Sequence, residues 1–385
     1  MKNNLLNELP VPFKLENDVL WMEAQAFNGI TQWLNNFEKM TVCAPIIPVH
    51  LIDPSISWKK VDDLPCRDRL AVFALPWGYH PKEHFRNRKM VAQLFAEQIP
   101  KHQYLLFANL GWLGAWGNVG AHQAQLAKRP YAVWLDWVLH EMPQNPTNSI
   151  VKTAWMKLSS FMLRRESLSV IHHASLGLFH GRSVYEGYAP YCANAQVVHD
   201  IHLKAEDVIA LDRLQERVLA NRSQPLHIVY VGRVNAMKGP LEWIEIVEKL
   251  VKTNPERTIL AKWMGDGPLL EECRQAVMKK GLQGVVEFPG GESDRGKVLA
   301  FLRAADVFLQ CHLTPESPRC LIEALMSGLP IVGFESPYAR DLVAHAPQAG
   351  WFSPLREIEA VAQLLAILST NHEQLENMTY AAREC

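Results

Sequence analysis

Two glutamates in the second half of the chain are spaced around a predicted helix start. The stretch HLTPESPRCLIEALMSGLP (312–330) contains Glu316 and Glu323, with a Ser-Pro pair between them. Ser317 suits an N-cap and proline suits the first helical position, so we expect a helix over about 318–327. Glu316 then precedes the helix, and Glu323 lies about 7–8 Å along its axis. Carboxylates accept hydrogen bonds from vicinal sugar hydroxyls; the alternative is a capped helix with two exposed glutamates.

The start of the same helix offers backbone donors as well. Its expected free amides are those of Arg319, Cys320 and Leu321, and together with the helix dipole they form an anion site. A diphosphate at the helix tip would have one carboxylate on each side. The two glutamates would then bind different parts of one ligand.

A second motif, VGRVNAMKG, places two cations after a buried strand. The strand ends at Gly232, and Arg233 and Lys238 follow in the loop before a helix that Pro240 is expected to start. Doubly wound sheets bind ligands at the carboxyl ends of their strands, and phosphate suits two cations there. The alternative is a solvated basic loop. The Walker pattern GxxxxGK[ST] is absent.

Two further strand ends carry glycines. GDGP, which contains Gly265, is interpreted mainly as a structural turn, and it lacks the GxGxxG pattern of nicotinamide-binding proteins. The strand at 284–290 contains Glu287 and Pro289 and leads into a Gly-Gly pair that would let the backbone approach a flat base. Gly232, Gly265, Glu287 and Pro289 are therefore candidate nucleotide-binding residues.

The elements that must position these residues alternate between apolar runs and helical patterns. Most runs are apolar throughout, which suits parallel strands covered on both faces. The expected strands are 18–24, 40–46, 70–76, 103–110, 131–137, 168–174 and 195–201 in a first series, and 226–232, 257–265, 284–290, 306–311 and 329–334 in a second. Two series of strand–helix units predict an α/β chain with two doubly wound sheets.

Length and composition limit the alternatives. The 385 residues are too many for one core, and a net charge of -1 gives no global attraction to nucleic acid. The 7 cysteines contain no CxxC pair, which argues against a disulfide framework or zinc site and favours a reducing compartment. Neither a signal peptide nor a membrane-spanning run is apparent. We expect a first domain over 1–203, a linker over 204–224, a second domain over 225–372, and a last helix over 373–385 that crosses back to the first domain.

The motifs VGRVNAMKG, GDGP, VEFPGG and ESPRCLIEALMSGLPIV, in this order, resemble the donor domain of retaining glycosyltransferase family 4 (group 1 glycosyltransferases). The resemblance covers 226–372 and implies the GT-B fold, with two Rossmann-like domains and a cleft between them. It implies that Arg233 and Lys238 bind the diphosphate of a nucleotide sugar. It also implies that Glu323 binds the ribose hydroxyls and that Glu316 contacts the donor sugar.

One departure concerns Glu316, because the family's two glutamates usually lie one residue further apart. The resemblance still implies transfer of a sugar from a nucleotide diphosphate to a hydroxyl of a glycan or glycolipid, in surface polysaccharide or glycolipid biosynthesis. Retention, no metal and no cofactor are expected, and no D-x-D pair is present. Arg233, Lys238 and the helix amides would stabilise the leaving diphosphate. The alternatives are a GT-B epimerase or phosphorylase and a non-catalytic sugar-nucleotide-binding protein.

The first half is less informative. The Asn-Gly pair at Gly29 resembles the family's glycine loop that faces the donor phosphates, or it is a simple turn. Asp136 follows an apolar strand near where the family places a reactive-centre acid or histidine, so it is the first candidate catalytic group there and His140 the second. His172 and His173 are expected to be structural residues of an apolar strand.

Two stretches of the first half suggest the acceptor. The glycine- and tryptophan-rich 108–126 would line a carbohydrate site or form a turn into a helix. Residues 151–167 mix aromatic and basic side chains, which suits a membrane-surface helix for a lipid-linked acceptor; an internal helix packed on the sheet is the alternative. We therefore expect a cytoplasmic protein, peripheral at the inner face of the membrane.

Overall fold

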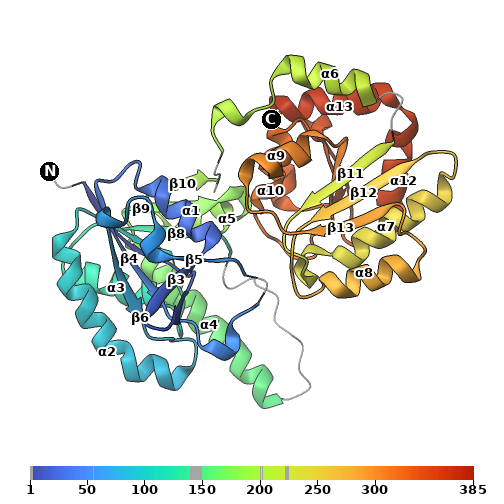
Figure 1. Cartoon of the computed structure of the whole chain (residues 1–385). Coiled ribbons are helices and arrows are strands. Elements are labelled where there is room, and N and C mark those ends of the chain that lie inside the picture. Colours follow the sequence, from blue (N-terminus) through green and yellow to red (C-terminus); the bar gives the residue numbers. More distant parts are fainter. Residues whose placement is uncertain are drawn as a thin grey trace. The chain divides into compact units, whose positions relative to one another are not determined.

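The computed structural model describes residues 3–54, 56–108, 110–138, 150–199, 201, 203–221 and 225–385. The chain forms two compact units, Met1–His202 and Leu203–Cys385. Each unit is built on one parallel sheet with helices packed on it (Figure 1). The prediction of an α/β chain with two doubly wound sheets is confirmed.

The sheet of the first unit has 7 parallel strands in the order β10-β9-β8-β7-β1-β4-β6. Its strands are β1 (Asn4–Glu8), β4 (Lys39–Pro45), β6 (Leu70–Leu75), β7 (Tyr104–Phe107), β8 (Ala132–Leu135), β9 (Leu176–His180) and β10 (Ala195–Val198). Its helices are α1 (Ala24–Trp33), α2 (Pro81–Gln98), α3 (Trp116–Leu126), α4 (Ile150–His172) and α5 (Gly181–Tyr188). The central strand β1 is missing from the predicted strands, because its sequence NLLNE shows no apolar run although most of it is buried.

A small antiparallel sheet accompanies it, with β2 (Phe13–Glu16), β3 (Val19–Glu23) and β5 (Trp58–Lys60) in the order β2-β3-β5. The strand predicted at 18–24 is therefore β3, but the prediction that it is parallel is wrong. Asn17 and Asp18 have φ of 51° and 60°, the positive values of a type I′ hairpin turn. This turn reverses the chain between β2 and β3.

The strand predicted at 168–174 is wrong. Residues 168–172 form the last turns of α4, and the strand begins only at Leu176 as β9. A short apolar run does not distinguish a strand from a half-buried helix. His172 and His173 are consequently exposed at the end of α4 rather than buried in a sheet.

The second unit has 6 parallel strands in the order β13-β12-β11-β14-β15-β16. They are β11 (Leu226–Val231), β12 (Ile259–Met264), β13 (Val286–Gly290), β14 (Val307–Gln310), β15 (Ile331–Phe334) and β16 (Gly350–Ser353). The helices are α7 (Pro240–Thr253), α8 (Leu270–Lys279), α9 (Arg295–Arg303), α10 (Arg319–Met326), α11 (Pro337–Leu342) and α12 (Ile358–Thr370). Trp243 and Trp263 are fully buried in the core between α7 and the sheet.

Two helices complete the second unit, α6 (Leu211–Asn221) and α13 (His372–Glu384). The residues expected to form a linker thus contain α6, which is fixed to the unit because Arg217 donates to the carbonyl oxygens of Ser327 and Gly328 at 2.8 and 2.6 Å. Arg383 of α13 donates to the carbonyl oxygen of Ile209 at 2.8 Å. That α13 also reaches the first unit stays a prediction.

Candidate functional site

The loops after β11 and β14 form one site at the switch point of the second sheet. The chain leaves β11 toward β12 on one side, and β14 pairs on the other side, which is where doubly wound sheets bind ligands. The loops are joined directly, because the amide of Leu313 donates to the carbonyl oxygen of Met237 at 2.8 Å. Gly239 makes the close approach possible, since a Cβ on it would lie 2.1 Å from the carbonyl oxygen of Cys311.

Lys238 and Glu316, predicted from separate motifs, meet in this site. The Lys238 ammonium forms an ion pair and hydrogen bond with Glu316, and the side chains are only 15% and 12% exposed. The hydroxyl of Thr314 donates to the other oxygen of Glu316 at 3.1 Å. The alternative of a solvated basic loop is thereby excluded for Lys238, and that of an exposed glutamate for Glu316. Arg233, at the start of the same loop, is half-buried.

A buried histidine, which the sequence analysis missed, supports this ion pair. The ring of His312 contacts the Tyr230 hydroxyl at 2.5 Å through Nε2, and its Nδ1 lies 3.9 Å from Glu316. Burial, and then the charge of Lys238, hold the pKa of His312 well below its usual value, so the imidazole is neutral at pH 7. Burial likewise raises the pKa of Tyr230 well above its ordinary range. A histidine four positions before a motif glutamate is the signal that would have found it.

The glycine turn at Gly265 is a structural lock, as its main interpretation predicts. The amide of Gly232 donates to Met264 at 3.0 Å, and that of Gly265 donates to Gly290 at 2.9 Å, so three neighbouring strand ends are tied together. The carboxylate of Asp266 accepts a hydrogen bond from the amide of Gly291 at 2.9 Å. A Cβ on Gly265 would lie 1.9 Å from the Gly232 carbonyl oxygen.

The helix predicted at 318–327 is α10, and its start differs by one residue from the prediction. Pro318, not Ser317, occupies the N-cap, and no side chain caps the helix. A proline there leaves β-region backbone before the helix, so the serine is pushed into the loop. The amide of Leu321 already donates to the Pro318 carbonyl oxygen at 3.2 Å, so the first two amides of the helix are the better donors for an anion.

Glu323 lies on α10 with its side chain buried rather than exposed. It is 8% exposed, and its carboxylate pairs with Arg295 Nη1, the first residue of α9, at 2.8 Å. Arg295 was not among the candidate residues. In the sequence it is only an arginine shortly after the Gly-Gly pair, and its contact with α10 depends on the fold.

The residues predicted on β13 lie on the outer face of that edge strand. Glu287 forms an exposed ion pair with Lys262 at 2.6 Å, and Pro289 is exposed. Phe288 between them enters the core. Their contact with a nucleotide base stays a prediction.

The first unit separates its candidate residues. Gly29 lies inside α1, so the predicted loop at this position is wrong: the residues around it continue an apolar helical face that outweighs the turn preference of Asn-Gly. Asp136 follows β8, is exposed, and accepts a hydrogen bond from Trp134 Nε1 at 3.0 Å. His140 lies outside the described residues. The described residues contain no group of three His, Cys, Asp or Glu side chains arranged to hold a metal ion.

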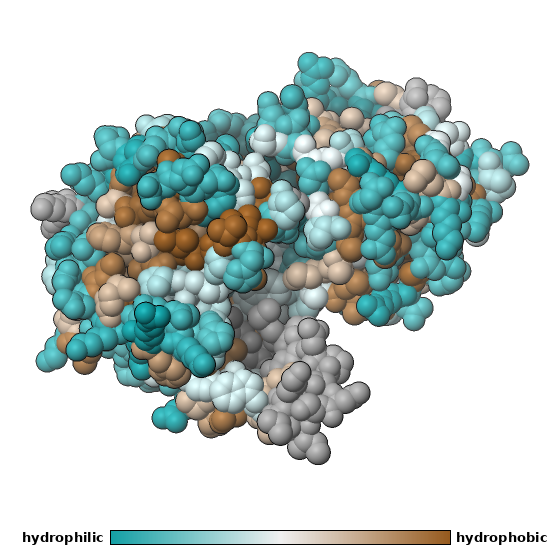
Figure 2. All heavy atoms as spheres, turned by 60° about the horizontal axis from the view of Figure 1, so that its bottom comes forward, coloured by the Kyte–Doolittle hydropathy of each residue, from teal (hydrophilic) through white to brown (hydrophobic). Residues whose placement is uncertain are grey.

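Residues 151–167 belong to α4, which exposes Trp155, Leu158 and Phe161. Apolar side chains also gather elsewhere on the first unit in the space-filling view (Figure 2). None of the described helices has the length and apolar character to cross a membrane. Contact of α4 with a membrane surface stays a prediction.

Comparisons with known proteins point to one family for the second unit. Residues 212–385 match the family described as "Glycosyl transferases group 1". WcaL of Escherichia coli (strain K12), named as a colanic acid biosynthesis glycosyltransferase, is 30% identical over 185 residues, 46% of this chain and 44% of WcaL. The amylovoran biosynthesis glycosyltransferase AmsK of Erwinia amylovora is 30% identical over 168 residues, 42% of this chain and 40% of AmsK. The match therefore spans less than half the length of each of these relatives.

The structural comparison covers both units. The crystal structure of HepE from Anabaena in complex with UDP matches with a TM-score of 0.64 at 15% identity, over 100% of this chain and 94% of that one. At this identity the likeness concerns the fold. The chain therefore has the GT-B fold of two Rossmann-like units, and its second unit is similar to the group 1 glycosyl transferases.

Proposed function

We propose that this chain is a retaining glycosyltransferase that moves a sugar from a nucleoside diphosphate sugar to a hydroxyl of a glycan or glycolipid. The observation that carries the proposal is the buried Lys238–Glu316 ion pair at the switch point, beside the start of α10. The names of the relatives favour surface polysaccharide biosynthesis. The UDP bound to HepE makes a uridine nucleotide the first donor to test.

In the proposed reaction, the bond between the sugar and the diphosphate breaks and negative charge grows on the leaving phosphate. Arg233, Lys238 and the amides of Arg319 and Cys320 would stabilise that charge electrostatically, as donors that the fold already holds in place. Lys238 is held in place by Glu316 before the ligand arrives, so little reorganisation is needed. No metal ion is required by this arrangement.

The two glutamates would bind the two sugar rings of the donor, the transferred sugar and the ribose. Glu316, with one oxygen on Lys238, has acceptor capacity left for a hydroxyl of the donor sugar. Glu323, held by Arg295, would accept hydrogen bonds from the ribose. Asp136 stays the proposed polar group of the first unit at the reacting centre.

The test incubates the protein with UDP-, GDP- and ADP-sugars and measures nucleotide release with and without glycan acceptors. We expect release from one donor that increases when an acceptor is added. Lys238→Ala should abolish release and strongly weaken nucleotide binding, whereas Lys252→Ala, on the exposed part of α7, should change neither. Tight nucleotide binding without turnover under any condition would make the chain a non-catalytic binding protein.

A further inference from the structure

A pocket in the first unit lies between α2, the loop after β7, α3 and α4. Its volume is about 90 Å³, room for several water molecules and comparable to part of a sugar ring. Its lining residues are His84, Phe85, Arg88, Gly111, Trp112, Ala115, Asn118, Val119, His122 and Glu166. No residue of the donor loops is among them.

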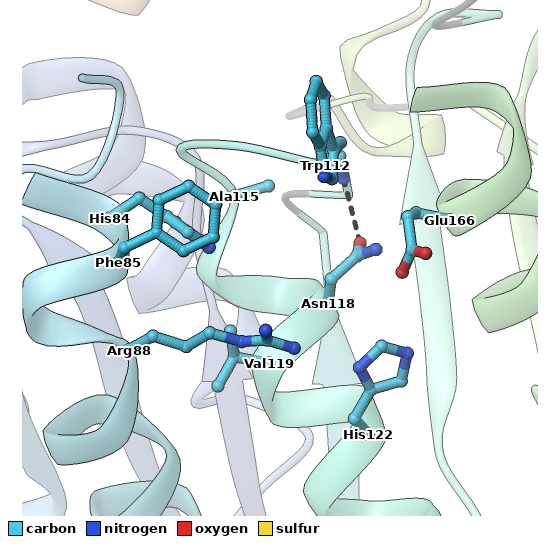
Figure 3. Close-up of a pocket in the computed structure, with 10 residues that line it drawn as sticks. His84, Phe85, Arg88, Trp112, Ala115, Asn118, Val119, His122 and Glu166 are labelled. Atoms are coloured by element: carbon cyan, nitrogen blue, oxygen red, sulfur yellow. Dashed lines mark hydrogen bonds between the residues drawn. The ribbon is translucent and has the colours of Figure 1, made fainter. Parts of the chain in front are cut away.

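Asn118 supplies the strongest sign that a ligand binds here. Its side chain is 5% exposed, and its Oδ1 accepts a hydrogen bond from the amide of Gly111 at 2.9 Å. That bond fixes the orientation of the amide, so Nδ2 is the donor end, and Nδ2 is buried with no hydrogen-bond partner among the described residues. In Figure 3 it points across the pocket toward Glu166. A buried amide donor that lacks a partner is costly, and a ligand acceptor would satisfy it.

Three more polar side chains are directed into the same space. Arg88 reaches in from α2, His122 from α3 and Glu166 from α4 (Figure 3). Burial lowers the pKa of His122, with an opposing effect of Glu166, so its ring is neutral at pH 7 and both donates and accepts. The lining of the pocket therefore contains both donors and acceptors.

Aromatic side chains form another part of the lining. His84 stacks on the buried Trp116, with ring centroids 4.7 Å apart, and accepts from the amide of Gly114 at 3.3 Å through Nδ1. Phe85 is 59% exposed at the edge, and Trp112 packs on Trp155 of α4 with centroids 5.8 Å apart. Flat apolar surfaces beside converging polar groups are typical of sites that bind small polar rings.

The charges of the pocket select the ligand class. One arginine and one carboxylate balance each other, so a phosphate would meet Glu166 and a cation would meet Arg88. A neutral polyhydroxylated ring suits both, because each hydroxyl donates to a carboxylate and accepts from an amide or a guanidinium.

We propose that this pocket binds one saccharide unit of the acceptor, with Asn118, Arg88, His122 and Glu166 as its specificity-determining residues. That the saccharide belongs to the acceptor rests on the proposed function, whereas sugar binding at the pocket can be measured without turnover. It accounts for the glycine- and tryptophan-rich loop after β7, which supplies Gly111 and Trp112.

The test measures binding of the methyl glycosides of glucose, galactose and mannose to the full chain by saturation-transfer NMR and titration. Glu166→Gln removes the carboxylate, and Asn118→Asp keeps the acceptor for Gly111 while removing the Nδ2 donor. Glu186→Gln, on the exposed face of α5, is the matched control. We expect one glycoside to bind and Glu166→Gln to weaken it about ten- to hundredfold, the cost of a charged hydrogen bond. Asn118→Asp should weaken it similarly, and Glu186→Gln not at all.

Nucleotide binding is measured on the same samples, which separates the two proposals. Glycoside binding that the pocket variants weaken, with or without nucleotide binding, supports the pocket; failure of nucleotide binding alone counts against the transferase. If no glycoside binds, if Glu166→Gln binds glycosides like the wild type, or if inorganic phosphate binds in their place, the pocket proposal is overturned. Thermal unfolding of each variant checks that the fold is retained. Glu166 is half-buried, so Glu166→Gln still tests the proposal if Asn118→Asp unfolds the protein.

Discussion

The two candidate sites of this chain hold their polar groups in opposite ways. At the switch point of the second unit, Lys238 is paired with Glu316, and Glu323 with Arg295. In the pocket of the first unit, the buried Nδ2 of Asn118 has no hydrogen-bond partner within the part of the chain that the structure describes. Ligands at the first site must share groups that already hold one another, whereas a ligand in the pocket completes an unfinished set. Removing one group should therefore affect stability at the first site and mainly affinity at the second.

The largest effect is expected from Lys238→Ala. It leaves the carboxylate of Glu316 buried without its cation, which costs about 3 kcal/mol of unfolding free energy. It also removes the proposed phosphate-binding cation, so nucleotide affinity should fall at least about a hundredfold. Urea unfolding and calorimetric titration measure the two. Adding Glu316→Gln should recover most of the stability but none of the affinity. If Lys238→Ala leaves stability unchanged, the contrast between a paired and an unfinished site is wrong.

The second-largest effect is expected from Gly265→Ala, which disturbs the backbone hydrogen bonds between strand ends rather than a charged group. Its new Cβ would clash with the Gly232 carbonyl oxygen, so the ends of β11, β12 and β13 must separate, at a cost of about 2 kcal/mol. Gly284→Ala, where a Cβ meets nothing within 4 Å, is the control. Thermal unfolding should show a large decrease for the first substitution and little change for the second. Equal melting temperatures would mean that the loops tolerate the shift.

A smaller effect is expected from Glu323→Gln. The amide keeps the shape but loses the charge that accepts hydroxyl donors, so affinity for the bound ribonucleotide should fall about tenfold. The matched 2′-deoxynucleotide should bind the variant and the wild type with similar affinity, because it lacks one of the hydroxyls. Glu287→Gln, on the exposed edge strand, tests the base-side prediction in the same titrations. A full loss for both nucleotides would assign Glu323 to the diphosphate instead.

The smallest effect concerns pH and His312. Its folded-state pKa is depressed, so above about pH 6.5 the folded and unfolded states are both neutral and no stability depends on it. Below that pH the unfolded chain takes up a proton that the folded chain excludes, so unfolding free energy falls by at most about 1.4 kcal/mol per pH unit. Urea unfolding at pH 8 and pH 5.5 should show a shallower decrease for His312→Asn. Equal decreases in the unfolding free energy of the variant and the wild type would mean that His312 does not contribute. The pH dependence would then come from other groups, such as the first-unit histidines whose pKa values are also lowered by burial.

The difference between the sites also explains what the sequence could predict. Arg233, Lys238, Glu316 and Glu323 stand in short motifs next to strand ends, so capping and strand–loop patterns located them. The partners Arg295 and His312 were missed, because pairing depends on which loops the sheet order brings together.

The pocket shows the same limit more strongly. Arg88, Asn118, His122 and Glu166 come from three helices, and no local pattern joins them. The loop predicted at Gly29 and the strand predicted at 168–174 were wrong for another reason. There the local preference of a few residues was outweighed by the helix in which they are packed.

The attachment of α6 by Arg217 has a practical consequence for dividing the protein. Its guanidinium covers the carbonyl oxygens at the end of α10, and the chain just before it donates from Ile209 to the carbonyl oxygen of Met326 at 2.8 Å. A fragment beginning at residue 225, where the apolar strand pattern resumes, would leave those carbonyls bare and loosen the helix whose other end is the proposed diphosphate site. A fragment beginning at Leu203 keeps them covered, and although it is the longer of the two, it is the piece on which donor recognition can be studied alone.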